Sequence, residues 1–530
     1  MRSVNYFDSE PRKSSSVLTT IATVAFLLSP MLLRAQNQRD FPPKNPVPLT
    51  TNKAAPDIRS SPFSPRAEGD TLFVVDEDPV GLDTDCKFRN DGPLVIELPV
   101  KRYVGAVNPD GTLVDPDGMI AAGFISATAK LRMPAKDIDV NGKPVPEIDE
   151  VYFNDTKIGV LSGANNAWKI NEFEVPIKLI KFPKPGVSGA PPDPAINTIE
   201  IQIDQGNSST GNEAWCMSLD WVELEFKAIA PIFLVHGTAA QSDTWDPHFT
   251  AYFSSKGIPW SNDINLKPNG TILENGKLLS MRLAELANSF GAKKCHIIAH
   301  SKGGLDTRAY LNLHYSPETL EVVSVFTLST PHHGTIISDI IVSARASVGR
   351  ESRDLAIRAL IYGDYFAFRA PKSPAIDNQT TASMAWFNAQ FPTVPPGIHF
   401  FNYGADADIN NSSFIEAGET DDLLPSSLSD DLKFISGSAM YRAIGEASSI
   451  SVTIGTRPGD YWGTKTFTSI DIANTNSNLE ENDLVTSVTS AESPMGTYIA
   501  TVDANHSSMK SPALASEILL YIITNFSFPF

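Results

Sequence analysis

One short segment in the second half of the chain constrains the fold more than any other. An apolar run at residues 295–299 leads into a turn that carries Ser301, and a helical pattern follows from Leu305. A serine on so sharp a strand-to-helix turn needs nearly side-chain-free neighbours two positions to either side, and Ala299 and Gly303 meet this need. The segment predicts Ser301 as a nucleophile at the end of a buried strand, with an ordinary turn and a polar serine as the alternative.

Strands and helices alternate on both sides of this segment. Residues 232–235 and 322–328 are apolar runs typical of buried strands, and residues 278–290 carry an apolar stripe with helical spacing. This alternation predicts a mostly parallel sheet with flanking helices over residues 229–530. Residues 336–396 show no clear strand, and we expect them to form a lid insertion or a plain packed helical insertion.

A candidate general base lies far downstream of the serine. Of the nine histidines, only His506 comes after the candidate acids, in a loop-like stretch before the last helical pattern. A general base must move enough to transfer a proton and must be oriented by a carboxylate on its other ring nitrogen. Several acidic residues are candidates for that carboxylate: Asp406, Asp408, Glu480, Glu481 and Asp483.

Three motifs together resemble a known enzyme family. They lie at residues 299–306 (AHSKGGLD), 329–334 (STPHHG) and 482–485 (NDLV). In this order they resemble the bacterial true-lipase branch of the α/β-hydrolase family, which implies an α/β-hydrolase fold for residues 229–530. The sequence departs from the family at the first small residue of the turn, which is alanine, and lacks the glycine of the family's D-G-L-V segment. Ser508 stands where calcium-binding members carry aspartate, so no metal is expected.

The resemblance implies roles for individual residues. Ser301, Asp483 and His506 correspond to the catalytic triad of a carboxylic-ester hydrolase that acts through an acyl-enzyme. The backbone N–H groups of Thr238 and Lys302 are expected to form the oxyanion hole. Four further residues are expected to line the substrate site: His236, Gly237, His300 and His332.

The first half of the chain has a different pattern. Residues 70–228 contain short runs of β-forming residues separated by Asp-Gly and Asn-Gly pairs, without a long helical stripe. We predict an all-β sandwich that serves as an accessory domain and loosely resembles galactose-binding-like jelly rolls. Trp168, Trp215 and Trp221 are either a platform for a polymer or carbohydrate surface or part of the core.

The N-terminal segment has the layout of an export signal. Basic residues precede an apolar run at residues 17–33. We predict a signal peptide at residues 1–35, with an uncleaved membrane anchor as the alternative, followed by a proline-rich linker at residues 36–69. A secreted or periplasmic location would allow Cys86 and Cys216 to form a disulfide.

The charge of the chain argues against some classes of partner. The formal net charge is −19 and no basic stripe is present, which argues against nucleic acid and anionic membrane surfaces. An ester or lipid is the expected substrate, and no cofactor is expected. Three alternatives to a lipase-like hydrolase remain open: a polyester depolymerase, an acyltransferase and a catalytically silent surface-binding protein.

Overall fold

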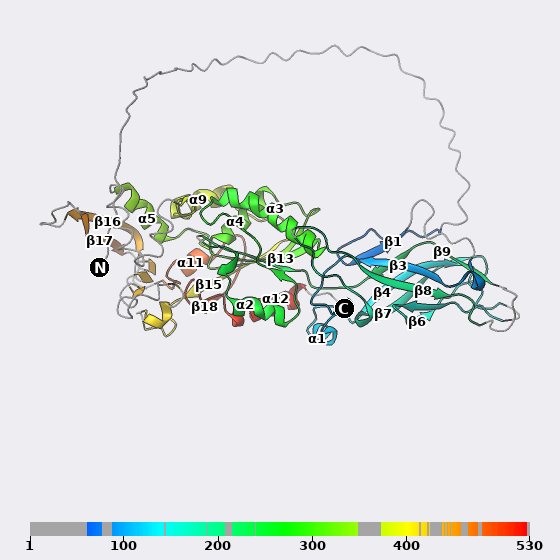
Figure 1. Cartoon of the computed structure of the whole chain (residues 1–530). Coiled ribbons are helices and arrows are strands. Elements are labelled where there is room, and N and C mark those ends of the chain that lie inside the picture. Colours follow the sequence, from blue (N-terminus) through cyan, green and yellow to red (C-terminus); the bar gives the residue numbers. More distant parts are fainter. Residues whose placement is uncertain are drawn as a thin grey trace, which may run out of the picture. The chain divides into compact units, whose positions relative to one another are not determined.

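The computed structural model of the chain is shown in Figure 1. It describes residues 61–76, 87–142, 145–187, 189–206, 215–238, 240–347, 373–412, 415–420, 423, 437–438, 440–441, 444–445, 447–456, 465–474 and 480–526. These residues all belong to one compact unit, Asp57–Phe530. The predicted signal peptide and most of the predicted linker lie outside the described residues.

Six parallel strands form the central sheet of the second half. Their order is β12 (Trp260–Ser261), β11 (Ile232–Val235), β13 (Lys294–His300), β14 (Glu321–Leu328), β15 (His399–Asp406) and β18 (Thr497–Asp503). All five neighbouring pairs are parallel. The strands β11 and β13 are almost entirely buried, because helices cover both faces of a sheet of this kind. The predicted parallel sheet is confirmed.

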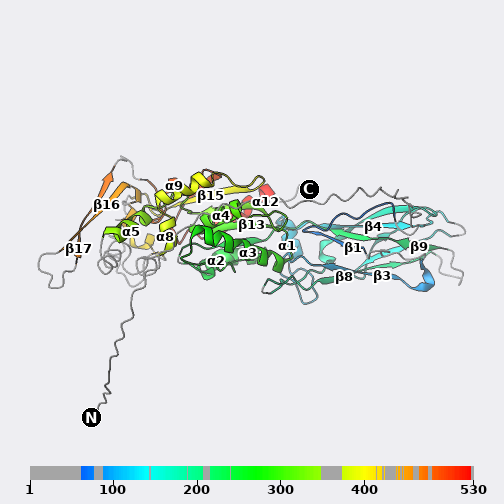
Figure 2. The ribbon, with the colours of Figure 1, turned by 90° about the horizontal axis from the view of Figure 1, so that it is seen from above.

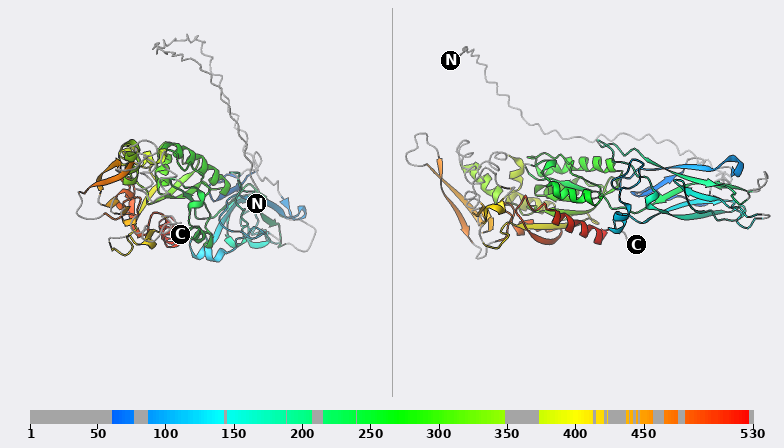
Figure 3. Two further views of the ribbon diagram at one scale, coloured as in Figure 1. Left: turned by 60° about the vertical axis from the view of Figure 1, so that its left-hand side comes forward. Right: turned by 60° about the horizontal axis from the view of Figure 1, so that its bottom comes forward.

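Helices lie on both faces of this sheet. One face carries α3 (Ile272–Phe290) and α4 (Lys302–Leu313), and the other carries α2 (Pro247–Ser255) and α12 (Pro512–Phe526), as Figures 1 and 3 show. Thr271 caps the N-terminus of α3, and its side chain accepts a hydrogen bond from a backbone N–H of the first turn. Gly291 follows the helix as its C-cap and adopts the left-handed conformation (φ 60°) that glycine favours.

Two antiparallel sheets form the first half (Figure 2). One contains β1 (Leu72–Val75), β10 (Val222–Glu225), β4 (Thr128–Lys136), β9 (Cys216–Leu219) and β2 (Lys87–Phe88), with β7 (Trp168–Pro176) paired to β4. The other contains β3 (Leu94–Val100), β8 (Ala195–Gln202), β5 (Glu150–Phe153) and β6 (Thr156–Val160). Alternate side chains of β3 and β8 are buried and join those of β4 and β10 in one apolar core. The jelly-roll resemblance stays a prediction.

The apolar core continues across the predicted domain boundary after residue 228. Arg102 is fully buried there, and its guanidinium donates to the carbonyl oxygens of Ile229 (3.2 Å) and Tyr103 (2.6 Å). The Tyr103 ring packs edge-on against Phe290 of α3, with 5.4 Å between the ring centroids. The division into two domains stays a prediction, and the two regions share buried contacts.

The described end of the predicted linker packs against β10. The Ser61 N–H donates to the Asp220 carboxylate at 2.9 Å. The Arg66 guanidinium lies 2.9 Å from the buried Glu223 carboxylate. Residues 61–69 are therefore fixed along the sheet, and the part of the chain that can serve as a tether ends earlier than the sequence suggests.

Trp221 belongs to the core. Its side chain is 1% exposed, its indole N–H donates to the Phe63 carbonyl at 3.1 Å, and the Arg132 guanidinium lies 5.9 Å from its ring centroid. Trp168 and Trp215 are partly exposed. Of the two interpretations left open for the tryptophans, the structure therefore supports the core for Trp221, because a buried ring cannot stack on a polymer surface.

The predicted insertion at residues 336–396 is helical where it is described. It contains α5 (Ile336–Ser347), α8 (Pro374–Asn378) and α9 (Thr381–Gln390). Beside α5 lies an antiparallel hairpin of β16 (Ala447–Thr456) and β17 (Lys465–Asn474), which the sequence analysis did not predict (Figure 2). No helix among the described residues is long and apolar enough to span a membrane.

The cysteines have different environments. Cys216 is disulfide-bonded, and its expected partner, Cys86, lies outside the described residues. Cys295 is free and fully buried at the start of β13. Burial raises the pKa of its thiol far above the ordinary value, so Cys295 behaves as the small hydrophobic residue that the sequence predicts.

Candidate active site

Ser301 occupies a strained turn between β13 and α4. Its φ of 56° and ψ of −134° lie outside the regions that residues with a side chain normally adopt. The Ser301 N–H donates to the Leu328 carbonyl at 2.9 Å, and the Thr330 hydroxyl donates to the Ser301 carbonyl at 2.8 Å. These two bonds to the end of β14 hold the turn in place. Backbone strain of this kind is typical of functional residues.

Glycines allow the turn to approach the loop that follows β11. A Cβ on Gly303 would lie 2.6 Å from the His236 carbonyl oxygen, and a Cβ on Gly237 would lie 2.7 Å from the Ser301 Cβ. Real Cβ atoms do not approach neighbours so closely, so both positions require glycine. Because Gly237 lies directly against Ser301, the next residue, Thr238, is well placed to supply a backbone donor near the serine.

Asp483 and His506 form a hydrogen-bonded pair. His506 Nδ1 lies 2.7 Å from Asp483 Oδ2, and the His506 backbone N–H donates to the Asp483 carbonyl at 3.0 Å. Asp483 is fully buried, and its Oδ1 accepts the backbone N–H groups of Val485 (2.9 Å) and Thr486 (2.6 Å). The fixed carboxylate orients the imidazole and leaves Nε2 as the nitrogen available to the pocket.

The other candidate acids have different partners. Asp406 accepts a hydrogen bond from the Tyr441 hydroxyl at 2.7 Å. Glu480 accepts one from a backbone N–H at 3.1 Å. Among the acids that the structure describes, Asp483 is the one hydrogen-bonded to the His506 ring. The geometry therefore favours Asp483 over its alternatives.

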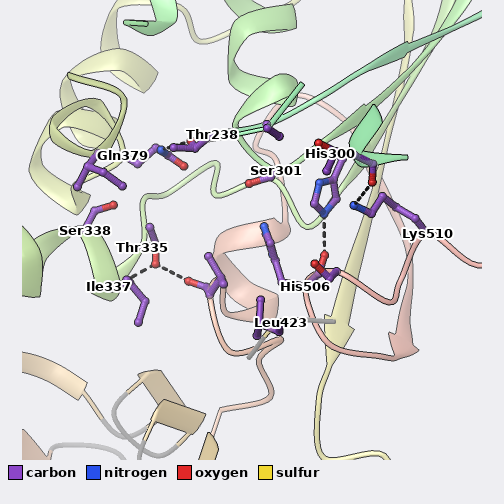
Figure 4. A pocket seen from close by; sticks show the side chains of 16 residues that line it. Thr238, His300, Ser301, Thr335, Ile337, Ser338, Gln379, Leu423, His506 and Lys510 are labelled. Carbon is purple, nitrogen blue, oxygen red and sulfur yellow. Dashed lines mark hydrogen bonds between the residues drawn. The ribbon is translucent and has the colours of Figure 1, made fainter. Parts of the chain in front are cut away.

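A pocket of about 100 Å³ opens beside Ser301. Its lining includes Gly237 and the polar residues Thr238, His300 and His506, and Figure 4 labels the last three. The apolar residues of its wall include Ile337, Ile376, Leu423 and Val485. An apolar wall close to a reactive polar group suits an ester with a hydrocarbon part. In the described part of the chain, no group of three or more His, Cys, Asp or Glu residues is arranged to hold a metal ion.

His300 lines the pocket and also supports the candidate base. Its Nε2 lies 2.7 Å from the His506 carbonyl oxygen, and the two ring centroids are 4.7 Å apart (Figure 4). Burial, together with the nearby charge of Lys510, keeps the pKa of His300 well below its usual range. The ring is therefore neutral and donates its Nε2–H to the loop that carries His506.

His236 and His332 do not line the pocket, which corrects the expectation that they contact substrate. The Leu266 backbone N–H donates to His236 Nε2 at 3.2 Å, so this ring holds the loop that contains Leu266 in place. His332 is fully buried, with Thr327 Oγ1 3.2 Å from its Nε2 and Arg308 Nη1 3.3 Å from its Nδ1. Both ring nitrogens of His332 therefore have protein partners, and neither is available to a substrate.

Several pocket residues were missed in the sequence analysis. Ser338 and Gln379 come from the predicted insertion, Thr335 directly precedes it, and Lys510 follows the candidate base. The Lys510 ammonium donates to a backbone carbonyl at 3.0 Å. No motif marks these residues, because they reach the pocket only through the packing of distant segments.

A buried ion pair lies in the first turns of α4. The Lys302 ammonium is 2.6 and 2.9 Å from the two Asp306 carboxylate oxygens, and the Asn275 side chain donates to the same carboxylate at 3.0 Å. Burial raises the pKa of Asp306 to about 6, although Lys302 acts in the opposite direction. The Lys302 side chain does not line the pocket, so its backbone N–H is the group that can serve an oxyanion.

Replacing Asp306 by asparagine is expected to destabilise the protein strongly. The change leaves the ammonium of Lys302 buried without an opposite charge, which typically costs about 3–5 kcal/mol of unfolding free energy. Urea unfolding of the two proteins measures this difference. Glu274→Gln is the matched control, because it breaks an exposed ion pair with Lys267 and should cost less than about 1 kcal/mol. Equal losses for both variants would contradict the account.

Comparison with known proteins gives partial matches. No protein-family model matches the chain. Triacylglycerol lipase 2 of Saccharomyces cerevisiae is 27% identical over 139 residues, which cover 26% of this chain and 38% of that protein. A triacylglycerol lipase of Pseudarthrobacter phenanthrenivorans is 27% identical over 187 residues, 32% of this chain and 55% of that protein. The chain thus spans about half or less of the length of these curated relatives.

Several solved structures are similar to part of the chain, among them two lipases. The mature form of Bacillus licheniformis lipase BlEst2 has a TM-score of 0.35 and 20% identity, covering 56% of this chain and 91% of that one. The lipase of Staphylococcus hyicus has a TM-score of 0.30 and 15% identity, covering 56% of this chain and 95% of that one.

Proposed function

We propose that the protein is a serine carboxylic-ester hydrolase of lipase-like specificity. One observation carries the proposal: strained Ser301 shares a pocket with His506, whose other ring nitrogen lies 2.7 Å from the buried Asp483 carboxylate. Nucleophile, acid and histidine follow one another in the chain order of α/β-hydrolases. The similarity to triacylglycerol lipases, at 27% identity over part of their length, supports the same class of reaction.

The geometry supports an acyl-enzyme mechanism as part of this proposal. His506 Nε2 accepts the hydroxyl proton of Ser301 while the serine oxygen attacks the ester carbonyl, and Asp483 stabilises the imidazolium that forms. The backbone N–H groups of Thr238 and Lys302 donate to the oxyanion of the tetrahedral intermediate. The alcohol leaves with the proton from His506. Water, deprotonated by the same histidine, then attacks the acyl-enzyme and releases the acid.

The compartment is part of the proposal. We infer that residues 1–35 direct export and that the protein works outside the cytoplasm, secreted or in the periplasm. The disulfide at Cys216 supports an oxidising compartment. The antiparallel sheets of residues 70–228 would then be an accessory region. A polymer or carbohydrate surface remains its candidate partner, and it would contact residues other than the buried Trp221.

The apolar wall predicts how the rate depends on acyl length. For nitrophenyl esters, kcat/KM should rise about fourfold for each methylene that the wall covers, because each buried methylene contributes about 0.8 kcal/mol. The rise should stop once the acyl chain extends beyond Ile337 and Ile376. The series is measured below the solubility limit of each ester, with Ser301→Ala as the blank. A wild-type rate equal to that blank on every ester would overturn the proposed function.

A further inference from the structure

One buried side chain connects the predicted oxyanion loop to the helical insertion. Gln379 directly follows α8 and is 4% exposed. Its amide Nε2 donates to the Thr238 hydroxyl at 2.8 Å and to the Ala375 carbonyl at 2.9 Å, and Figure 4 shows Gln379 and Thr238 close together. The amide therefore fixes the Thr238 side chain to the end of α8.

The same residue continues a chain of hydrogen bonds along the pocket wall. The backbone carbonyl of Gln379 accepts a hydrogen bond from the Thr335 backbone N–H at 2.9 Å. The Thr335 hydroxyl in turn donates to the Val485 backbone carbonyl. The Val485 N–H donates to Asp483 Oδ1 at 2.9 Å. The loop that carries Thr238 is thus connected through Gln379 to the turn that carries the candidate acid.

We propose that Gln379 is a positioning residue that holds the Thr238 backbone N–H in place for the oxyanion. The inference rests on the proposed function, since it assigns a role in stabilising a tetrahedral intermediate. The hydroxyl held by Gln379 and the N–H that would serve the oxyanion belong to the same residue, so fixing the first limits the movement of the second. A donor acts on an oxyanion only when it is held at about 2.7–3.1 Å, so a small displacement lowers the rate.

The hydrogen bond between Gln379 and Thr238 also couples α8 to the reaction centre. Gln379 lies between α8 and α9, inside the segment predicted as a lid or a plain packed insertion. When α8 occupies the position seen here, the hydroxyl of Thr238 is bound. A displacement of α8 that breaks this bond would release the oxyanion loop. The position of α8 therefore controls the stabilisation of the intermediate.

The test compares full-length Gln379→Met, Thr238→Val and the double variant on a soluble short-chain ester. Each change removes the bond between the two side chains without changing their size greatly. The kcat of each single variant should fall about 10- to 100-fold, less than the roughly 100- to 1,000-fold loss caused by removing an oxyanion donor outright. KM should stay within about twofold, because the donor acts on the transition state. The double variant should be no worse than the singles, since all three lose the same interaction.

Two controls separate positioning from a merely structural role. Gln390→Met makes the same chemical change at the exposed end of α9 and should leave kcat unchanged. Thr238→Ser keeps the hydroxyl and should restore most of the kcat that Thr238→Val loses. Thermal unfolding of every variant shows whether a loss of rate merely follows a loss of stability.

Each outcome bears on the inference. Unchanged kcat in folded Gln379→Met or Thr238→Val would overturn the inference and leave the proposed function intact. Multiplicative losses in the double variant would also overturn it, because the two side chains would then act independently. A wild-type rate no higher than that of Ser301→Ala would overturn the inference together with the proposed function.

Discussion

Replacing Ser301 by alanine is expected to remove nearly all ester hydrolysis from a protein that stays folded. The side chain supplies the nucleophile, and its loss from a serine triad lowers kcat by about a millionfold. His506→Ala should have a similar effect, because the members of a triad act as a unit. Steady-state hydrolysis of a soluble ester, together with circular dichroism of each variant, measures both parts of this expectation.

A third substitution at the same position tests the strained turn. Ser301→Gly also lacks the nucleophile, but glycine adopts a φ of 56° without a steric penalty. The glycine variant should therefore be inactive and at least as resistant to urea as Ser301→Ala. Substantial turnover by any folded variant at position 301 would show that the chemistry takes place elsewhere.

Replacing Asp483 by asparagine is expected to lower kcat by about ten-thousandfold. The amide keeps the shape of the carboxylate, but it cannot stabilise the imidazolium form of His506 and favours the wrong ring tautomer. The same change at Asp406 is the matched control. This carboxylate is also buried but is bound to the Tyr441 hydroxyl, so its replacement should affect stability more than kcat.

The comparison of the two variants decides the identity of the acid. Stopped assays at high enzyme concentration are needed to measure the low residual rate of Asp483→Asn. A larger loss of kcat in Asp406→Asn than in Asp483→Asn would show that the acid has been misassigned. If both variants kept the wild-type kcat, neither Asp483 nor Asp406 would be the catalytic acid.

The sequence predicts those features that follow from local rules. The buried strands before and after Ser301 appear as apolar runs, because strands covered on both faces contain few polar residues. The turn itself is predictable, since a serine at a φ of 56° tolerates only small neighbours. His506 could be found because no other histidine follows the candidate acids.

Features that depend on long-range packing could not be predicted in this way. Gln379 reaches the pocket from an insertion without a motif, and Thr335 reaches it from the residue directly before that insertion. Their hydrogen bonds join segments more than a hundred residues apart. His332 belongs to a motif, yet the structure places it behind the wall of the pocket. Arg102 gives no sign in the sequence that it is buried between the two halves of the chain.

Covalent labelling shows whether Ser301 is an activated nucleophile, and it does not require the right ester. A fluorophosphonate probe is incubated with the wild-type protein, Ser301→Ala and His506→Ala, and the modified peptide is identified by mass spectrometry. The account predicts one adduct, on Ser301 in the wild-type protein. It also predicts no adduct in Ser301→Ala and a strongly slowed reaction in His506→Ala. A folded wild-type protein that does not react, or an adduct that persists in Ser301→Ala, would contradict the claim.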